Sequence, residues 1–563
     1  MCYIHTREFT MAISIERWRS HKHLRKEYQE QLKQGHLGDA FAAHIDFGTG
    51  GLRGIMGVGT NRINDITIMQ ATLGFADYLL EQTNNPTVVI AYDTRNDSKR
   101  FAIIAAKTLA IKNISTRVFQ GPRPTPQLSF AVRKYKATGG IVITASHNPP
   151  AYNGYKIYDE EGCQLVPDKA KRVSDMIEKY RDTLDVGLAS LTSLIKSKTI
   201  KLIPASFDDR YVSFVKKISP KRKNRDLTIV YTPLHGTGAA FGARILKELG
   251  FRVHTVQEQL KPDGNFTTVG YPNPEDTSVF KMAKALGNEK KATLLLATDP
   301  DADRLGVAAF ENGTYVHFSG SEIGILLLDY LLANRRVKNH DVFISTIVTP
   351  KLGEAIALDH GLRTIMTLTG FKFIGEQIAK LSNQERFFFG YEESCGYLAS
   401  PEVRDKDAFQ AMALVASMMA DYQKKNQSLS ERLDALYRKY GYYGYELATI
   451  DLTKNERIRN TDIVMEQLRK TAWISFKKLD VLACEDYSSG TKTYVDGRSD
   501  KIKLPTSDVI KLVFADGGSL TVRPSGTEPK LKIYMVAIAK TDVESKEKLS
   551  LIKTSLKEFI DHL

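Results

Sequence analysis

The chain has 563 residues, of which 42% are hydrophobic and 26% are charged, a composition typical of a globular protein. This length exceeds what one hydrophobic core can serve, so we expect about four domains. The net charge of +14 suits an anionic partner, either a nucleic acid or a phosphorylated small molecule. No apolar run reaches the roughly 18 residues that a membrane-spanning helix needs, so we expect no membrane partner.

The four cysteines, Cys2, Cys163, Cys395 and Cys484, form no C-x-x-C pair. This spacing argues against a zinc site and against a disulfide framework, and we expect reduced thiols. The N-terminus carries charged residues and no apolar stretch typical of a secretory signal, so we expect a cytoplasmic protein. Met11 is an alternative start.

The first 45 residues are polar and helical in character. A loose apolar stripe of Trp18, Leu24, Tyr28 and Leu32 predicts packing against the rest of the protein. The glycine-rich segment 47–54 follows, and its backbone can approach a ligand closely because glycine lacks a side chain.

Strands and helices then alternate in three units, and in each unit a polar loop follows an apolar strand. The predicted strands are 87–92, 117–119, 140–143, 228–231, 252–256, 292–298, 342–345, 363–366 and 387–391, and the predicted helices include 101–111, 240–249 and those that start at 321 and 351. This order is typical of an α/β protein with ligands at the carboxyl ends of its strands.

The last part of the chain changes character. Asp516-Gly517-Gly518 between two apolar runs predicts a hairpin, and Thr541 with Glu544 predicts a capping box at a closing helix. We therefore expect three consecutive α/β domains with mixed sheets and a smaller C-terminal α+β domain, around a central cleft. The predicted boundaries are an N-terminal helical extension at 1–45, α/β domains at 46–205, 206–318 and 319–440, and the α+β domain at 441–563.

Ser146 follows the strand 140–143, in the loop Thr144-Ala145-Ser146-His147-Asn148-Pro149. Taken alone, such a loop is also typical of a turn that only caps a strand. A hydrolase elbow would need glycines where Thr144 and Asn148 stand, so His147 is predicted to contact phosphate or to orient the site instead of acting as a triad base.

Asp299, Asp301 and Asp303 alternate along the chain, and three such carboxylates repel one another unless a cation lies between them. Hard oxygen ligands favour Mg²⁺ or Ca²⁺. An EF-hand is excluded, because Arg304 and Phe310 stand where its loop needs glycine and glutamate. A solvated acidic turn is the alternative.

Two further loops carry polar groups suited to a sugar phosphate. Glu392 and Ser394 can bond adjacent sugar hydroxyls, and the segment from Arg523 through Ser525 and Gly526 to Thr527 offers donors for a phosphate dianion. Each loop by itself is equally typical of an ordinary turn. The four loops together overturn that interpretation.

In their order along the chain, these loops resemble the four signature loops of the α-D-phosphohexomutases, and the resemblance covers nearly the whole chain from about residue 40. The segments 47–54, 149–156 and 523–530 resemble the phosphoglucomutase/phosphopentomutase branch. Pro300, Ala302 and Tyr391 depart from glycines that many relatives carry, which bears on subfamily more than on activity.

The resemblance implies that Ser146 is the phosphoserine and, with the three aspartates, a ligand of Mg²⁺. It implies the following further site residues: Arg53, His147, Lys156 and Lys406 at the reaction centre, Arg304, Thr369, Gly370, Glu392 and Ser394 at the substrate, and Arg523, Ser525, Gly526 and Thr527 at the phosphate that does not react. Lys156 and Lys406 are the candidate proton carriers.

The activity implied is the interconversion of glucose 1-phosphate and glucose 6-phosphate through glucose 1,6-bisphosphate. We expect a monomer or weak homo-oligomer. A phosphopentomutase and a glucose 1,6-bisphosphate synthase remain open on the same loops. A nucleic-acid-binding protein is a remote alternative that rests on charge alone, since the basic cluster 221–225 has no interleaved aromatics. We expect no nucleic-acid partner.

Overall fold

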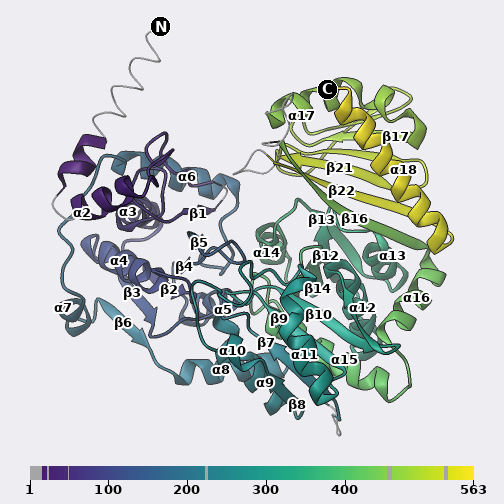
Figure 1. Cartoon of the computed structure of the whole chain (residues 1–563), viewed down its shortest axis with the longest axis horizontal. Helices are drawn as coiled ribbons and strands as arrows, with labels where there is room; N and C mark the ends of the chain where they lie inside the picture. Colours follow the sequence, from purple (N-terminus) through teal and green to yellow (C-terminus); the bar gives the residue numbers. More distant parts are fainter. Residues whose placement is uncertain (1–14, 22–23, 49, 222–225, 453–459, 525–529) are drawn as a thin grey trace. The chain divides into compact units, whose positions relative to one another are not determined.

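The computed structural model describes residues 15–21, 24–48, 50–221, 226–452, 460–524 and 530–563 (Figure 1). Its contacts divide the chain into two compact units, residues 1–323 with 371–424 and residues 324–370 with 425–563. The five-part division drawn from the sequence stays a prediction. Among the described residues, no helix is long and apolar enough to cross a membrane.

The first unit contains a six-stranded mixed sheet in the order β1-β5-β4-β2-β3-β6. Neighbours among β4, β2, β3 and β6 pair in parallel, whereas β5 pairs antiparallel with β4 and β1. The strands are β1 (Gly51–Ile55), β2 (Thr87–Tyr92), β3 (Ser115–Phe119), β4 (Gly139–Ile143), β5 (Tyr152–Tyr158) and β6 (Ile200–Ile203).

Helices cover both faces of this sheet because both faces of its central strands are apolar. Gly139 of β4 faces α3, where an added Cβ would lie 2.9 Å from Phe75, and Gly140 faces α5, where it would lie 2.7 Å from Val132. The flanking helices are α3 (Asp65–Gln82), α4 (Ser98–Ile111), α5 (Thr125–Tyr135), α6 (Pro167–Ile177) and the short α7 (Leu191–Lys196).

The N-terminal segment packs on α3. Trp18 is buried with its ring edge-on to Phe41, and Tyr28 of α2 (Arg25–Lys33) joins the same cluster. The predicted stripe was wrong for Leu32, which is half exposed. The neighbouring Gln31 makes the contact there instead, because its side-chain oxygen accepts a hydrogen bond from the backbone N–H of Val58.

The same unit contains a five-stranded sheet in the order β11-β10-β9-β7-β8, parallel through β9, β7 and β8 and antiparallel beyond. Its strands are β7 (Thr228–Thr232), β8 (Arg252–Thr255), β9 (Leu294–Thr298), β10 (Leu305–Glu311) and β11 (Thr314–Phe318). The associated helices are α8 (Ser206–Lys216), α9 (Gly242–Glu248), α10 (Gln257–Leu260), α11 (Lys281–Lys290) and α15 (Ala408–Gln423). An antiparallel pair, β14 (Arg386–Glu392) and β15 (Gly396–Leu398), and α14 (Phe371–Lys380) complete this unit.

The second unit ends in a seven-stranded antiparallel sheet in the order β16-β22-β21-β20-β17-β18-β19. Its strands are β16 (Tyr442–Asp451), β17 (Val481–Asp486), β18 (Thr491–Tyr494), β19 (Ser499–Lys501), β20 (Ile510–Phe514), β21 (Ser519–Pro524) and β22 (Lys530–Ala539). The other elements are the parallel strands β12 (Asp341–Thr346) and β13 (Arg363–Thr367) with α12 (Gly320–Asn334), α13 (Leu352–Asp359), α16 (Leu429–Tyr440), α17 (Thr461–Ser475) and α18 (Asp542–Asp561).

The predicted fold class of three α/β domains with mixed sheets and a C-terminal α+β domain is confirmed, and so is the hairpin between β20 and β21. The predicted capping box at α18 was half wrong. The Thr541 hydroxyl accepts the Glu544 N–H, but the Glu544 carboxylate accepts the N–H of Lys540 instead of that of Thr541. The central cleft stays a prediction.

Candidate active site

Ser146 lies just beyond the carboxyl end of β4, in the left-handed backbone region with φ of +50°. The Thr144 hydroxyl accepts its backbone N–H at 2.8 Å, which stabilises this tight turn. The side chain is buried, and its Oγ donates a hydrogen bond of 2.7 Å to Asp299. The turn therefore directs a serine hydroxyl at the predicted metal loop.

The Arg95 guanidinium holds the serine loop in place through hydrogen bonds to its backbone. It donates to the backbone carbonyls of Ser146, Asn148, Pro149 and Tyr152, and it pairs with the buried Asp93 carboxylate at 3.4 Å. Arginine suits this role because its planar fork can serve several acceptors at once. The position of the serine is thus fixed by four carbonyl contacts from one side chain.

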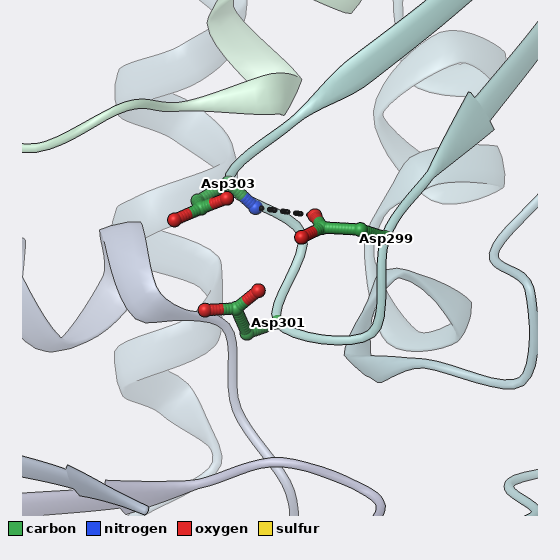
Figure 2. A group of neighbouring side chains, drawn as sticks. All are labelled: Asp299, Asp301 and Asp303. Carbon is green, nitrogen blue, oxygen red and sulfur yellow. Dashed lines mark hydrogen bonds between the residues drawn. The ribbon is translucent and has the colours of Figure 1, made fainter. Parts of the chain in front are cut away.

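Asp299, Asp301 and Asp303 lie in the loop between β9 and β10, and their carboxylates turn toward a common space (Figure 2). One oxygen of each lies within 4.8 Å of the others, and all three residues are buried. The loop is tightened by Asp299 Oδ1, which accepts the N–H groups of Asp303 at 3.1 Å and Arg304 at 3.0 Å.

The electrostatics of this cluster suit a metal ion. Burial, together with repulsion from Asp301, raises the pKa of Asp299 and of Asp303, because three buried carboxylates resist ionising side by side. Asp301 Oδ1 and Asp303 Oδ1 are buried with no hydrogen-bond partner among the described residues. Unpartnered carboxylate oxygens are ligands for a hard cation, so the three side chains can hold a metal ion.

Two lysines face the aspartates from different elements. Lys156 of β5 lies 3.3 Å from Asp301, and Lys406 lies 3.2 Å from Asp303 and 3.8 Å from Glu392. Burial lowers the pKa of Lys406, but Asp303, Asp405 and Glu392 outweigh it, and the pKa lies above the ordinary lysine value. Lys406 therefore keeps its positive charge in the site.

Glu392 and Ser394 lie where β14 turns into β15, and the Ser394 hydroxyl donates 2.8 Å to Glu392. This turn joins the metal loop, because the N–H of Leu305 donates to the carbonyl of Cys395 at 3.0 Å. Arg304 pairs with Glu275 at the same place. A backbone hydrogen bond thus joins the loop of the sugar-binding candidates to the loop of the three aspartates.

Arg53 and His147 flank the serine. Arg53 is exposed on β1 and donates 3.1 Å to the Asn148 side chain, and His147 Nδ1 lies 3.2 Å from the Ser146 hydroxyl with its ring edge-on to Tyr271. The glycine-rich segment that precedes Arg53 packs against β5. A Cβ on Gly51 would lie 2.2 Å from a backbone carbonyl of that strand, so its glycine is required by strand packing.

Models of the phosphoglucomutase/phosphomannomutase domains match this chain in order: alpha/beta/alpha domain I at residues 44–183, domain II at 209–312, domain III at 319–440 and the C-terminal domain at 482–545. A phosphoglucomutase of Staphylococcus aureus (strain MRSA252) is 38% identical over 520 residues, which cover 92% of this chain and 94% of the relative. The chain belongs to the phosphoglucomutase/phosphomannomutase family. It is therefore an enzyme, an isomerase of the phosphohexomutase superfamily.

Other comparisons agree with this family. A phosphoglucomutase of Staphylococcus haemolyticus is 38% identical over 88% of this chain and 90% of its own length. Two solved structures share the fold: pp63/parafusin from Paramecium (TM-score 0.67, 19% identity, 92% of this chain and 95% of that chain) and a family protein from Burkholderia thailandensis (TM-score 0.66, 18% identity, 91% and 97%).

Three of the predicted substrate-binding residues belong to the first unit, and the rest belong to the second. Arg304, Glu392 and Ser394 lie beside the aspartates together with Lys406. Thr369 and Gly370 follow β13 in the second unit, where Gly370 has a φ of +115°. Arg523 lies in β21, half-buried, and the predicted Ser525, Gly526 and Thr527 lie outside the described residues.

Sequence reasoning missed three residues that build the site: Arg95, Thr125 and Asp405. Thr125, at the start of α5, donates its hydroxyl to Asp301 Oδ2 at 2.8 Å and its N–H to the Asp301 carbonyl at 3.0 Å. Arg95 and Thr125 each follow the carboxyl end of a strand, β2 or β3. Ser146 was singled out because it follows the carboxyl end of an apolar strand, and the same criterion could have found Arg95 and Thr125.

Proposed function

We propose that this enzyme interconverts glucose 1-phosphate and glucose 6-phosphate, with Ser146 as the phosphoryl carrier. The observation that carries this proposal is the 2.7 Å contact between the Ser146 hydroxyl and Asp299, inside a buried group of aspartates and lysines. The names of the relatives, which are phosphoglucomutases, support the choice of substrate.

We propose Mg²⁺ as the metal, held by Asp299, Asp301, Asp303 and an oxygen of the phosphorylated Ser146. Three carboxylate ligands suit a hard cation such as Mg²⁺ and leave a coordination position for a phosphate oxygen. When bound, Mg²⁺ supplies positive charge against the phosphoryl oxygens. The unpartnered oxygens of Asp301 and Asp303 support this assignment.

In the proposed reaction, the substrate hydroxyl attacks the phosphorus on Ser146. The bond between phosphorus and Ser146 Oγ breaks as the bond to the sugar oxygen forms, and the hydroxyl proton passes to Lys156, because Lys406 keeps its positive charge beside Asp303 and Glu392. The product of this step is glucose 1,6-bisphosphate. It reorients in the site and then returns its other phosphoryl group to Ser146. The same compound would activate enzyme that has lost its phosphate.

The first-unit side chains have distinct parts in this scheme. Arg53, His147 and Lys406 offer positive charge or hydrogen bonds around Ser146, where charge spreads over the transferred group. Glu392 and Ser394 would bind sugar hydroxyls, with Arg304 beside them.

The phosphate that does not react would bind the second unit. Arg523, Ser525, Gly526 and Thr527 supply donors for a dianion, and Thr369 and Gly370 lie in a loop of the same unit. One site for both orientations of the bisphosphate would explain why these donors belong to a separate part of the chain.

We further propose a cytoplasmic monomer or weak homo-oligomer whose partner is a phosphorylated sugar. Free thiols at Cys163, Cys395 and Cys484 support a reducing compartment. Neither a nucleic acid nor a membrane has a place in this proposal. Salt-sensitive DNA or RNA binding that survives Ser146→Ala would contradict it.

A coupled assay tests the proposed activity. Purified enzyme with Mg²⁺ and a trace of glucose 1,6-bisphosphate should turn over glucose 1-phosphate faster than ribose 1-phosphate or mannose 1-phosphate. The variant Ser146→Ala should have no mutase activity. Preference for the pentose would favour a phosphopentomutase, net formation of bisphosphate would favour a synthase, and a fully active Ser146→Ala variant would remove Ser146 as carrier.

A further inference from the structure

Lys406 reaches the aspartates from the segment between β15 and α15. Its stem crosses β15 at Gly396, where an added Cβ would lie 2.2 Å from Lys406 Cδ. The ammonium group ends 3.2 Å from Asp303. A lysine side chain has four rotatable bonds, so contacts with surrounding residues are needed to hold its ammonium group at this one position.

The residue before Lys406 is fixed by a buried tyrosine. The Tyr158 hydroxyl donates 2.7 Å to Asp405 Oδ2, and Asp405 Oδ1 accepts the backbone N–H of Lys406 at 2.8 Å. Both side chains are buried. Tyr158 lies two residues after Lys156 on β5, so the two point to the same face of the sheet. One strand thus supplies a lysine to the site and the anchor of the other lysine.

The residue after Lys406 is fixed by a second buried tyrosine. The Tyr211 hydroxyl of α8 donates 3.0 Å to Asp407 Oδ1. The same carboxylate caps α15, where it accepts the N–H groups of Phe409 at 3.0 Å and Gln410 at 3.2 Å. The backbone of Lys406 is therefore held on one side by a contact to strand β5 and on the other side by a contact to helix α8.

We propose that the pairs Tyr158–Asp405 and Tyr211–Asp407 position Lys406 for phosphoryl transfer. The tyrosines contact neither the aspartate cluster nor Glu392 by any hydrogen bond among the described residues, so they are positioning residues that act through Lys406. This inference rests on the proposed function, in which Lys406 faces the transferred group. A displacement of about 1 Å in such a group can cost about a hundredfold in rate.

Removal of each hydroxyl tests the inference. Tyr158→Phe and Tyr211→Phe keep the ring volume and should lower kcat for glucose 1-phosphate about tenfold, with KM changed little, because the ammonium group is displaced by less than 1 Å. The matched control is Tyr155→Phe. Tyr155 is fully buried on the same strand, but its hydroxyl bonds Thr72 at 3.2 Å, so this variant should keep the wild-type kcat.

A double-mutant cycle separates positioning from general stability. In the Lys406→Met background, Tyr158→Phe should lower kcat no further, whereas thermal unfolding should show the same small shift in both backgrounds. An additive loss of kcat, or a wild-type kcat in both tyrosine variants, would overturn the positioning role and leave the proposed function intact. Full activity in Lys406→Met would instead remove the role given to Lys406, and this inference with it.

Discussion

The Ser146 hydroxyl and the Asp299 carboxylate lie in hydrogen-bond contact at 2.7 Å, although 153 positions separate them in the chain. Ser146 follows a strand of the six-stranded sheet, and Asp299 follows a strand of the five-stranded sheet. The contact therefore joins the carboxyl ends of two strands from different sheets, where α/β proteins place their ligands. The hydroxyl that we propose as the phosphoryl carrier and a candidate metal site meet at that junction.

Loss of one aspartate should abolish activity through loss of the metal. Asp303→Asn keeps the shape of the side chain but removes a charge, so we expect weaker Mn²⁺ or Mg²⁺ binding by titration calorimetry and at least about a hundredfold lower kcat. Removal of metal with EDTA should abolish the activity of the wild-type enzyme, and added Mg²⁺ should restore it.

The matched control is Asp168→Asn, an exposed aspartate in the first turn of α6. It should bind metal as the wild type does. Metal-independent turnover, or unchanged metal affinity in Asp303→Asn, would contradict the assignment of the aspartates as a metal site.

The Thr125 hydroxyl should tune the metal site without contacting the metal. Thr125→Val keeps the side-chain shape and frees Asp301 Oδ2 from its 2.8 Å hydrogen bond, so we expect metal affinity to fall about tenfold to a hundredfold. Thr116→Val is the control. Thr116 is equally buried, but its hydroxyl has no hydrogen-bond partner among the described residues. Equal metal affinities in the two variants would contradict the role of Thr125.

The sequence was sufficient to predict which strand ends carry chemistry, because an apolar strand followed by polar residues is a local pattern. It predicted the loops of Ser146, Asp299 and Glu392. It was not sufficient to predict which loops touch. Thr125 reaches Asp301 over 176 positions, and Tyr158 reaches Asp405 over 247. Such contacts depend on how whole sheets pack, which periodicity along the chain does not encode.

Gly396→Ala should lower activity and leave the fold intact. The new methyl group would lie 2.2 Å from Lys406 Cδ and 3.0 Å from Glu392 Cγ, so both side chains must move. We expect kcat to fall about tenfold or more because the ammonium group is displaced. Steady-state kinetics and circular dichroism would check this result, and a variant with wild-type kcat would show that the position of Lys406 is unimportant.

Lys511 should make stability depend on alkaline pH. It is buried on β20, donates 2.6 Å to the Ile347 carbonyl, and burial lowers its pKa from 10.5 to about 8. Between these values the unfolded chain holds a proton that the folded protein has released. The free energy of unfolding should therefore gain about 3 kcal/mol from this group as pH rises from 8 to 10.5.

Urea unfolding of the wild type and of Lys511→Met across this range would measure the effect as a difference in slope. The variant lacks the titrating group, so its stability should gain less as pH rises. Lys503→Met, at an exposed lysine, should follow the wild type. Parallel pH profiles for the wild type and Lys511→Met would contradict the lowered pKa.

The central claim, that Ser146 carries the phosphoryl group, is tested most directly by peptide mapping of the purified enzyme by mass spectrometry. One phosphoryl group should be found on the peptide that contains Ser146. It should be lost when glucose 1-phosphate is added in excess and should return with glucose 1,6-bisphosphate. A fully active enzyme whose Ser146 peptide never carries phosphate would contradict the account.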